Sequence, residues 1–389
     1  MCFLCPYATY VVQKKIYNNH TMKYRRMPIE AESPEQIGYD AIECNLSESS
    51  VTDFILNDIQ FSLNDLRLEY TGHYGKQELR ELIIKSSPSL SADDVLLTNG
   101  AAGALFIINT ALLEREDHLI VVRPNYATNL EVPKAIGCNI TFIDLQFEEQ
   151  WKIDIDKIKA AVTTSTKLIS ITTPHNPTGV VMNENDLHAL ASFAEEKNIF
   201  LLVDETYRDA CFITPYPPAA TINKNVITVS SLSKAYGLPG LRMGWIITQN
   251  KELMHTFLSA KEMIYITNSV VDEELAYRFF LQKEKLSTEI SSRAKEKFDI
   301  LCKWMSKQDT LDYIIPQGGV VCFAKFKDEL KIDTEKFYSI LFNKYKTMVG
   351  PGHWFEMPDT YMRIGFGWPD KDKLEKGLNN ILLAAEEAG

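Results

Sequence analysis

A lysine stands in the loop that follows one of the most apolar runs of the chain. The run VITVS at 226–230 is short and rich in β-branched residues, as expected for a buried strand, and SLSKAYGLPGLR follows it and carries Lys234. A lysine at the mouth of a buried strand is poorly solvated, which favours its neutral amine, and a neutral amine is a nucleophile. A solvated loop lysine is the ordinary alternative, so the neighbouring residues must decide between the two.

Three further polar residues stand just beyond apolar runs. Asp204 follows IFLLV at 199–203, Asn176 follows KLISIT within TPHNPTG, and Tyr126 follows HLIVV within RPNYATN. Ligands of parallel sheets gather beyond the carboxyl ends of the strands, so these side chains are expected in one crevice. A buried carboxylate such as Asp204 is costly unless a cation pairs with it. Lys234 comes 30 residues later, which fits one helix between two parallel strands, so both can face the same ligand.

The other polar groups of this crevice suit a phosphate ester and an aromatic ring. Ser231 and Arg242 supply a hydroxyl and a planar guanidinium, which bind phosphate. The turn NGAAGAL opens a helix, and the free backbone N–H groups of a helix start attract an anion. The residues of that helix start are Gly100, Ala101 and Ala102. Because the face of Tyr126 can also cover an aromatic ring, the set predicts pyridoxal 5′-phosphate (PLP) as cofactor.

These residues are spaced along a regular alternation of apolar runs and helical stretches. Between the runs, stretches such as GALFIINTALLER and ENDLHALASFAEEKN have apolar residues recurring at three and four positions, as in helices. Continuous apolar runs that alternate with helices predict an α/β domain with a mostly parallel seven-stranded sheet covered by helices. The seven expected strands are 94–98, 118–122, 140–144, 167–172, 199–203, 226–230 and 243–247.

The chain beyond about residue 285 has a different pattern. It turns charged and helical in SSRAKEKFDILCKWMSK and then has strand-like runs in GGVVCFAKF and YMRIGF, which predicts a smaller α+β domain. A length of 389 residues suits two domains. The expected parts are a disordered extension at 1–21, a segment at 22–60 that contributes to the small domain, a large PLP-binding domain at 61–285 and the small domain at 286–389.

The composition favours a small-molecule ligand. A formal net charge of −11 argues against a nucleic-acid or anionic-membrane surface, because both need basic patches. Seven cysteines, an odd number spread along a long chain, do not form a disulfide framework, so a cytoplasmic location is expected. The CFLC sequence at 2–5 lacks a second cysteine pair or a histidine cluster, and we expect no metal there.

Six motifs carry a resemblance to a known family. In chain order they are YTGHYGKQELR, TNGAAGALF, HNPTG, VDETY, SLSKAYGLPGLRMGW and YMRIGF. Over about residues 40–368 they resemble the fold-type I PLP-dependent enzymes, specifically the class I/II aminotransferase family. The resemblance implies an aspartate-aminotransferase-like fold and an enzyme that exchanges an amino group between an L-amino acid and a 2-oxo acid.

The same resemblance implies a role for each matching residue. Lys234 would link to the cofactor as an aldimine and Asp204 would pair with the pyridine nitrogen, with Tyr126 stacked on the ring as the third catalytic residue. Arg363 would take the α-carboxylate of the substrate, beside Asn176. The other cofactor ligands would be Asn176 and Tyr207 at the phenolic oxygen, and Gly100, Ala101, Ala102, Ser231 and Arg242 at the phosphate. Tyr70 would reach the phosphate of a neighbouring subunit, which implies a homodimer with shared active sites.

One segment departs from the family pattern. Family members usually keep a glycine-containing loop near the substrate, whereas this chain has CNLSESSVTDF at 44–54 with Glu48. Glu48 is either a solvated loop acid or the partner of a cationic substrate side chain, and the second reading makes the substrate a basic amino acid. A subset of the family that acts on arginine-like substrates resembles this segment loosely, and some of its members oxidise or cyclise their substrates.

Other classes of protein remain to be weighed. PLP-dependent β-lyases and decarboxylases share every cofactor residue named above, so the sequence leaves them open. A PLP-binding regulator would need a fused DNA-binding region, and neither the N-terminal length nor the charge supports one. A nicotinamide dehydrogenase would need G-x-G-x-x-G after the first strand, which NGAAGA does not supply.

Overall fold

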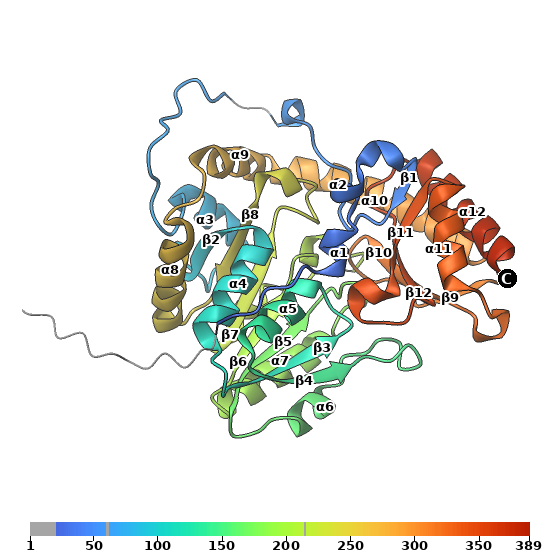
Figure 1. Ribbon diagram of the computed structural model, residues 1–389. Coiled ribbons are helices and arrows are strands. Elements are labelled where there is room, and N and C mark those ends of the chain that lie inside the picture. Colours follow the sequence, from blue (N-terminus) through green and yellow to red (C-terminus); the bar gives the residue numbers. More distant parts are fainter. Residues whose placement is uncertain (1–20, 60–61, 214) are drawn as a thin grey trace, which may run out of the picture.

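The computed structural model describes residues 21–59, 62–213 and 215–389, and its larger part is built on a seven-stranded sheet (Figure 1). β8 is antiparallel to both of its neighbours, and every other pair in this sheet is parallel. The predicted seven-stranded, mostly parallel sheet is therefore confirmed. From edge to edge the strands are β2 (Val95–Asn99), β8 (Met243–Ile247), β7 (Val226–Ser231), β6 (Phe200–Asp204), β5 (Thr166–Thr172), β3 (His118–Arg123) and β4 (Asn139–Asp144).

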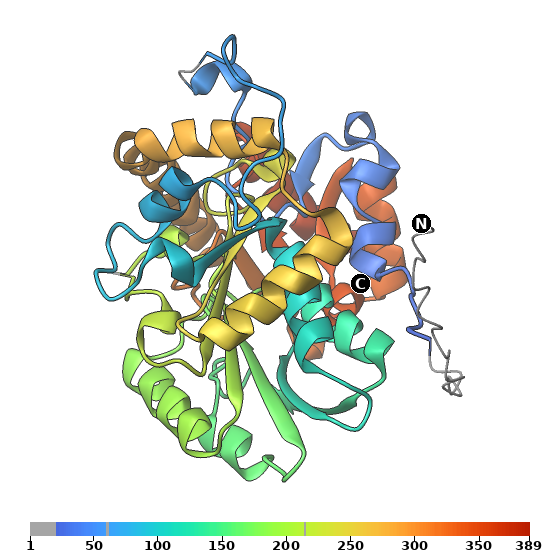
Figure 2. The same ribbon diagram turned by 90° about the vertical axis from the view of Figure 1, so that its left-hand side faces the viewer.

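Helices cover both faces of this sheet, which is why its strands are continuous apolar runs. On one face pack α4 (Gly100–Leu112), α5 (Ala127–Ile136) and α8 (Lys251–Tyr265). Figure 2 shows α8 lying across the sheet. On the other face pack α3 (Gln77–Ile83), α6 (Ile155–Ala160), α7 (Glu184–Glu196) and α9 (Val270–Leu281). Successive residues of one strand serve opposite faces, as with Val121 toward α4 and Val122 toward α7.

A second, five-stranded sheet forms the smaller part. Its first strand comes from the N-terminal segment and pairs in parallel with β11, while the other pairs are antiparallel. Figure 1 shows the blue β1 beside the red C-terminal elements. The strand order is β1 (Cys44–Leu46), β11 (Thr347–Pro351), β12 (Tyr361–Gly365), β10 (Val321–Phe326) and β9 (Leu311–Tyr313). The segment 22–60 thus contributes a strand to the small sheet, and the expected domain boundaries themselves stay a prediction.

The remaining helices connect or cover these two sheets. The long α10 (Lys283–Met305) runs from the large part to the small one, where its apolar side packs with α11 (Thr334–Asn343) and α12 (Lys371–Ala388). Two single-turn helices, α1 (Pro28–Ala31) and α2 (Pro34–Ile37), precede β1 and lie between the two parts (Figure 1).

Two sequence predictions fall outside this description. The CFLC motif and residues 1–20 of the expected N-terminal extension lie outside the described residues. In the described part of the chain, no helix combines the length and the apolar character needed to cross a bilayer.

Candidate active site

A cavity of about 510 Å³ lies at the carboxyl ends of β5, β6 and β7, and residues of both sheets line it. Thr172, Asp204 and Ser231, the last residues of these three strands, belong to its wall. The structure therefore gathers in one place most of the residues singled out from the sequence. Those that line the cavity are Glu48, Ala101, Ala102, Tyr126, Asn176, Asp204, Tyr207, Ser231, Lys234, Arg242 and Arg363.

Two of the predicted site residues do not line this cavity. Gly100 is the first residue of α4 and directly precedes Ala101. Tyr70 lies before α3 and is 81 % exposed. Its expected role at a phosphate in a neighbouring subunit concerns a second chain, and in the single chain Tyr70 is a surface residue.

Asp204 is a buried acid at the end of β6. Its side chain is 4 % exposed, and its Oδ1 accepts hydrogen bonds from the backbone N–H of Thr206 at 3.1 Å and from the Thr206 hydroxyl at 2.7 Å. Asn129 donates to Oδ2 at 3.4 Å. Among the described residues no basic side chain forms an ion pair with Asp204, and burial raises the pKa of its carboxyl group. A ligand cation at this position would favour the ionised form.

Lys234 follows β7 and places its amine in the same cavity. Burial lowers the pKa of this amine, Glu48 opposes the shift and Arg363 adds to it. Among the described residues, no acidic side chain forms an ion pair with this amine. The side chain thus has the poor solvation that the sequence predicted for a nucleophilic lysine.

An anion site lies at the start of α4. Among the described residues no side chain caps this helix, and the oxygen of the N-cap residue Asn99 accepts a hydrogen bond from Asn268 at 2.9 Å. The Arg242 guanidinium lies beside it: a Cβ on Gly100, whose φ is +71°, would sit 2.6 Å from Arg242 Nη2. Arg242 Nη1 also donates to the Ser233 hydroxyl at 3.5 Å. Free backbone N–H groups, a guanidinium and serine hydroxyls together suit a phosphate.

Arg363 is a buried cation with an unused donor. It is 3 % exposed, and it donates from Nη1 to Asn176 Oδ1 at 3.1 Å and from Nη2 to the Ser47 carbonyl at 2.7 Å. Its Nε has no partner in the described part of the chain, and its guanidinium lies 4.9 Å from the centre of the Phe355 ring. A buried guanidinium without an ion pair suits a carboxylate ligand.

Two tyrosines complete the wall of the cavity. The Tyr207 hydroxyl donates to the Ser49 carbonyl at 2.8 Å, and burial raises its pKa to about 12, so this phenol stays protonated at neutral pH. Tyr126 is half-buried at the start of α5. A planar ligand can pack against its ring.

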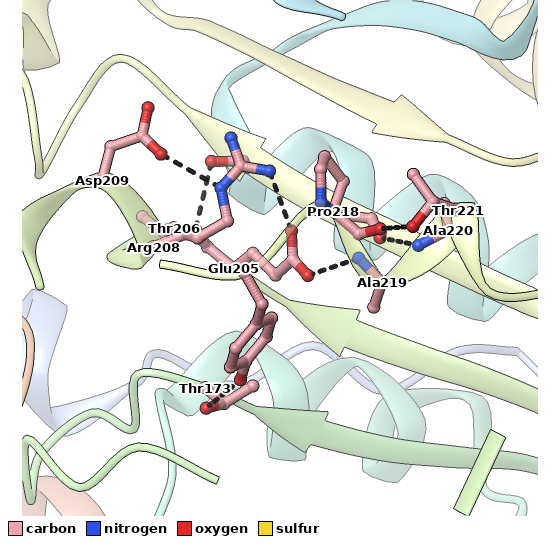
Figure 3. A network of polar contacts seen from close by, with 12 residues as sticks. Thr173, Glu205, Thr206, Arg208, Asp209, Pro218, Ala219, Ala220 and Thr221 are labelled. Carbon is pink, nitrogen blue, oxygen red and sulfur yellow. Dashed lines mark hydrogen bonds and ion pairs between the residues drawn. The ribbon is translucent and has the colours of Figure 1, made fainter. Parts of the chain in front are cut away.

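Glu205, the residue that follows Asp204, belongs to a network of polar contacts (Figure 3). Buried Glu205 accepts from the backbone N–H of Ala219 at 2.7 Å and has Arg208 Nη1 at 3.6 Å, while Arg208 donates to Asp209 at 3.0 Å. Asp209 in turn binds Lys283 at 2.7 Å and accepts from the Tyr236 hydroxyl. The network therefore ties the end of β6 to the loop of Lys234 and to the first residue of α10. Burial raises the pKa of Glu205 to about 7, against the effect of Arg208.

Sequence reasoning missed several residues of this site. Thr206 and Ser233 stand inside the quoted motifs, and the turn-forming Asp-x-Thr pattern was a signal for the first. Asn129 closes the quoted RPNYATN motif, but its hydrogen bond to Asp204 follows only from the tertiary fold. Glu30 and Glu35 carry no local signal, because only the tertiary fold brings them to the cavity.

Comparison with known proteins identifies the family. A family model described as aminotransferase class I and II matches residues 45–381. The chain belongs to this family. Its expected membership and its aspartate-aminotransferase-like fold are thereby confirmed, and members of the family typically bind PLP.

Several individual proteins resemble the chain over most of its length. A probable aspartate/prephenate aminotransferase of Aquifex aeolicus is 25 % identical, with 94 % of this chain and 95 % of that protein covered. Capreomycidine synthase of Streptomyces vinaceus is 26 % identical over 85 % and 87 % of the two chains. The crystal structure of a PLP-dependent aminotransferase from Streptococcus suis aligns with a TM-score of 0.87 at 25 % identity, covering 95 % of this chain and 99 % of that one.

The relatives of the chain also include a protein that is named as a regulator. The transcriptional regulator NorG of Staphylococcus aureus is 24 % identical over 82 % of this chain and 73 % of its own length. Family membership therefore establishes the fold and leaves the activity to the chemistry of the site.

Proposed function

We propose that the protein is a PLP-dependent aminotransferase that transfers an amino group between an L-amino acid and a 2-oxo acid. One observation carries the proposal: a poorly solvated lysine, a buried carboxylate and a buried arginine face one cavity, and none of the three has an ion-pair partner among the described residues. A ligand with a carbonyl, a cationic ring nitrogen and a carboxylate would match all three groups.

The donor set of the cavity fits PLP. The uncapped start of α4, with Ala101 and Ala102, would hold the phosphate together with Ser231 and Arg242. Asp204 would pair with the ring nitrogen. Tyr126 would cover the ring face, and Asn176 and Tyr207 would bind the phenolic oxygen. Bound PLP supplies an electron sink for bonds to the α-carbon of the substrate.

The chain's own residues would then bind, orient and move protons. Arg363 would hold the α-carboxylate with its free Nε–H, and its bond to Asn176 fixes the guanidinium plane. Lys234, whose lowered pKa favours the neutral amine, would take the proton from the α-carbon as a general base. Holding the carboxylate away from the breaking bond favours proton removal over decarboxylation.

We propose further that the protein acts as a cytoplasmic homodimer with shared active sites. Apolar side chains on the surface support the dimer: Leu68, Tyr70 and Met263 are between 81 % and 87 % exposed. Large exposed apolar groups of this kind mark protein interfaces. In such a dimer Tyr70 of one subunit would reach the phosphate bound by the other.

One experiment tests the activity. The purified protein is incubated with PLP, reduced with borohydride and digested, and the modified peptide is identified. The unreduced protein is then given each amino acid with and without a 2-oxo acid acceptor. Formation of a new amino acid only when the acceptor is present supports aminotransfer. Ammonia, carbon dioxide or a cyclised product without an acceptor would contradict it and indicate a lyase, a decarboxylase or a cyclase.

A further inference from the structure

The N-terminal segment contributes an acidic part of the cavity wall. Glu30 lies in α1, Glu35 lies in α2 and Glu48 follows β1, and all three line the cavity. No basic residue of this segment lines it. We call these three glutamates the acidic wall.

The acidic wall has no cationic partner in the described part of the chain. None of its carboxylates forms an ion pair there, and the only side-chain hydrogen bond found for the three is the one that Glu48 accepts from the Tyr39 hydroxyl at 3.0 Å. Tyr39 is itself stacked on Trp368, with ring centres 6.0 Å apart, which helps to fix the orientation of Glu48. The three acids therefore face the cavity without an ion pair among the described residues.

These carboxylates are close enough to influence one another and the reactive groups. Burial raises the pKa of Glu48, Glu35 raises it further, and Lys234 lowers it. The charges of all three glutamates raise the pKa of Lys234, and those of Glu30 and Glu48 raise the pKa of Arg363. Like charges that share a cavity destabilise each other unless a cation joins them.

The charge of the cavity becomes more one-sided once its other groups are assigned. Its basic side chains are Lys234, Arg242 and Arg363, and its acids are Asp204 and the acidic wall. In the proposed function the phosphate takes Arg242, the ring nitrogen takes Asp204 and the α-carboxylate takes Arg363. Lys234 reacts as a neutral amine. Three carboxylates then remain, and the substrate side chain is the group left to meet them.

We propose that the acidic wall binds a cationic substrate side chain, so that the preferred substrate is an L-amino acid ending in a guanidinium or an ammonium group. This inference rests on the proposed function, because Arg363 must hold the opposite end of the same molecule. The unpaired Nε–H of the buried Arg363 is an independent sign that a carboxylate ligand belongs in this cavity. A substrate with a carboxylate at one end and a cation at the other satisfies both sets of groups.

The test uses ligands that bind without reacting. 5-Guanidinopentanoate and 6-aminohexanoate carry a carboxylate and a terminal cation but no α-amino group. Hexanoate and glutarate have an apolar and an acidic end instead. Calorimetric titration of the PLP-loaded protein should give Kd values at least about tenfold lower for the two cationic ligands than for hexanoate, with glutarate weakest. Added salt should weaken only the cationic preference, because Glu30 and Glu35 are exposed.

Variants locate the preference in the wall. Glu35→Gln and Glu48→Gln should each raise the Kd of 5-guanidinopentanoate about tenfold and leave the Kd of hexanoate unchanged. Asp40→Asn is the matched control. Asp40 belongs to the same segment, is exposed and does not line the cavity, so this variant should bind both ligands with unchanged Kd values. Because Glu35 is exposed, its variant should fold even if Glu48→Gln does not.

Two different failures can be told apart. Equal affinity for hexanoate and 5-guanidinopentanoate, or an unchanged preference in Glu35→Gln and Glu48→Gln, overturns the role of the acidic wall. If PLP is not trapped at Lys234, the proposed function fails. A ranking of kcat/KM with glutamate or phenylalanine above arginine and lysine would also overturn the inference while leaving aminotransfer intact.

Discussion

Replacing Asp204 by asparagine removes a charge and one long hydrogen bond, the one that Asn129 donates to Oδ2 at 3.4 Å. The amide oxygen of the introduced side chain can accept both hydrogen bonds that Thr206 now donates to Oδ1, at 3.1 Å and 2.7 Å, so the local geometry should persist. The phosphate site at the start of α4 is untouched. We therefore expect Asp204→Asn to slow turnover strongly and to weaken the binding of PLP much less.

The size of the effect follows from the burial of Asp204. At 4 % exposure and without a cationic partner in the described part of the chain, its charge is free to act on a bound ring nitrogen. A buried charge-assisted pair contributes about 3 kcal/mol, and its loss at the transition state corresponds to a rate about a hundredfold or more lower.

Rapid mixing of the PLP-loaded variant with a saturating amino acid measures the rate directly, and fluorescence titration measures PLP affinity. Thr206→Val is the control, because it deletes one hydrogen bond to the carboxylate and keeps the charge of Asp204. It should slow the reaction less than about tenfold. A rate change below about threefold in Asp204→Asn would refute the reasoning, because the ring nitrogen would then not depend on this carboxylate.

Three further predictions concern the lysine, the phosphate site and the buried acid beside Asp204. Lys234→Ala should abolish borohydride-trapped PLP on the peptide that contains residue 234, and trapping at another lysine would contradict the assignment. Gly100→Ala should weaken PLP binding by about tenfold or more because its Cβ would meet Arg242 at 2.6 Å, whereas Gly137→Ala, equally left-handed at φ +82° but in open space, should leave PLP affinity unchanged. Glu205 has its pKa raised to about 7 in the folded state, so the folded protein holds a proton that the unfolded chain has lost, and stability falls as pH rises from about 4.5 to 7. Urea titrations give the free energy of unfolding of Glu205→Gln and of the wild type at pH 5 and pH 8. Between these two pH values the difference, variant minus wild type, should rise by on the order of 2–3 kcal/mol, and a difference independent of pH would contradict this prediction.

The strands were predictable because burial on both faces leaves a simple signature. Each of the seven expected strands overlaps an observed one with ends displaced by at most one residue, as with 226–230 against Val226–Ser231. The candidate site was predictable for a related reason. Asp204 ends β6, and Asn176 and Lys234 follow the ends of β5 and β7 on either side of it, so all three lie at the same edge of the sheet.

The acidic wall and the site of Tyr70 depend on information that is not local. Glu30 and Glu35 lie on helices of a single turn, whose position at the cavity is set by packing between the two sheets and not by any periodicity. The burial of Glu205 could not be predicted from the sequence either. The motif VDETY was explained by a role for Asp204, and nothing in it indicated that the next residue is buried too. Tyr70 is exposed in one chain, and its expected partner would belong to a second chain.

A shared physical cause links the groups of the cavity. Lys234, Asp204 and Arg363 come from different elements, yet burial shifts the pKa of each toward its neutral form, and none forms an ion pair in the described part of the chain. Such groups reduce the stability of the fold, since a buried charge without a partner is unfavourable by several kcal/mol. A ligand that supplies the missing partners binds only the folded state and so offsets this loss. The acidic wall extends the same logic to the substrate side chain: a cation relieves the repulsion among Glu30, Glu35 and Glu48, whereas a carboxylate increases it.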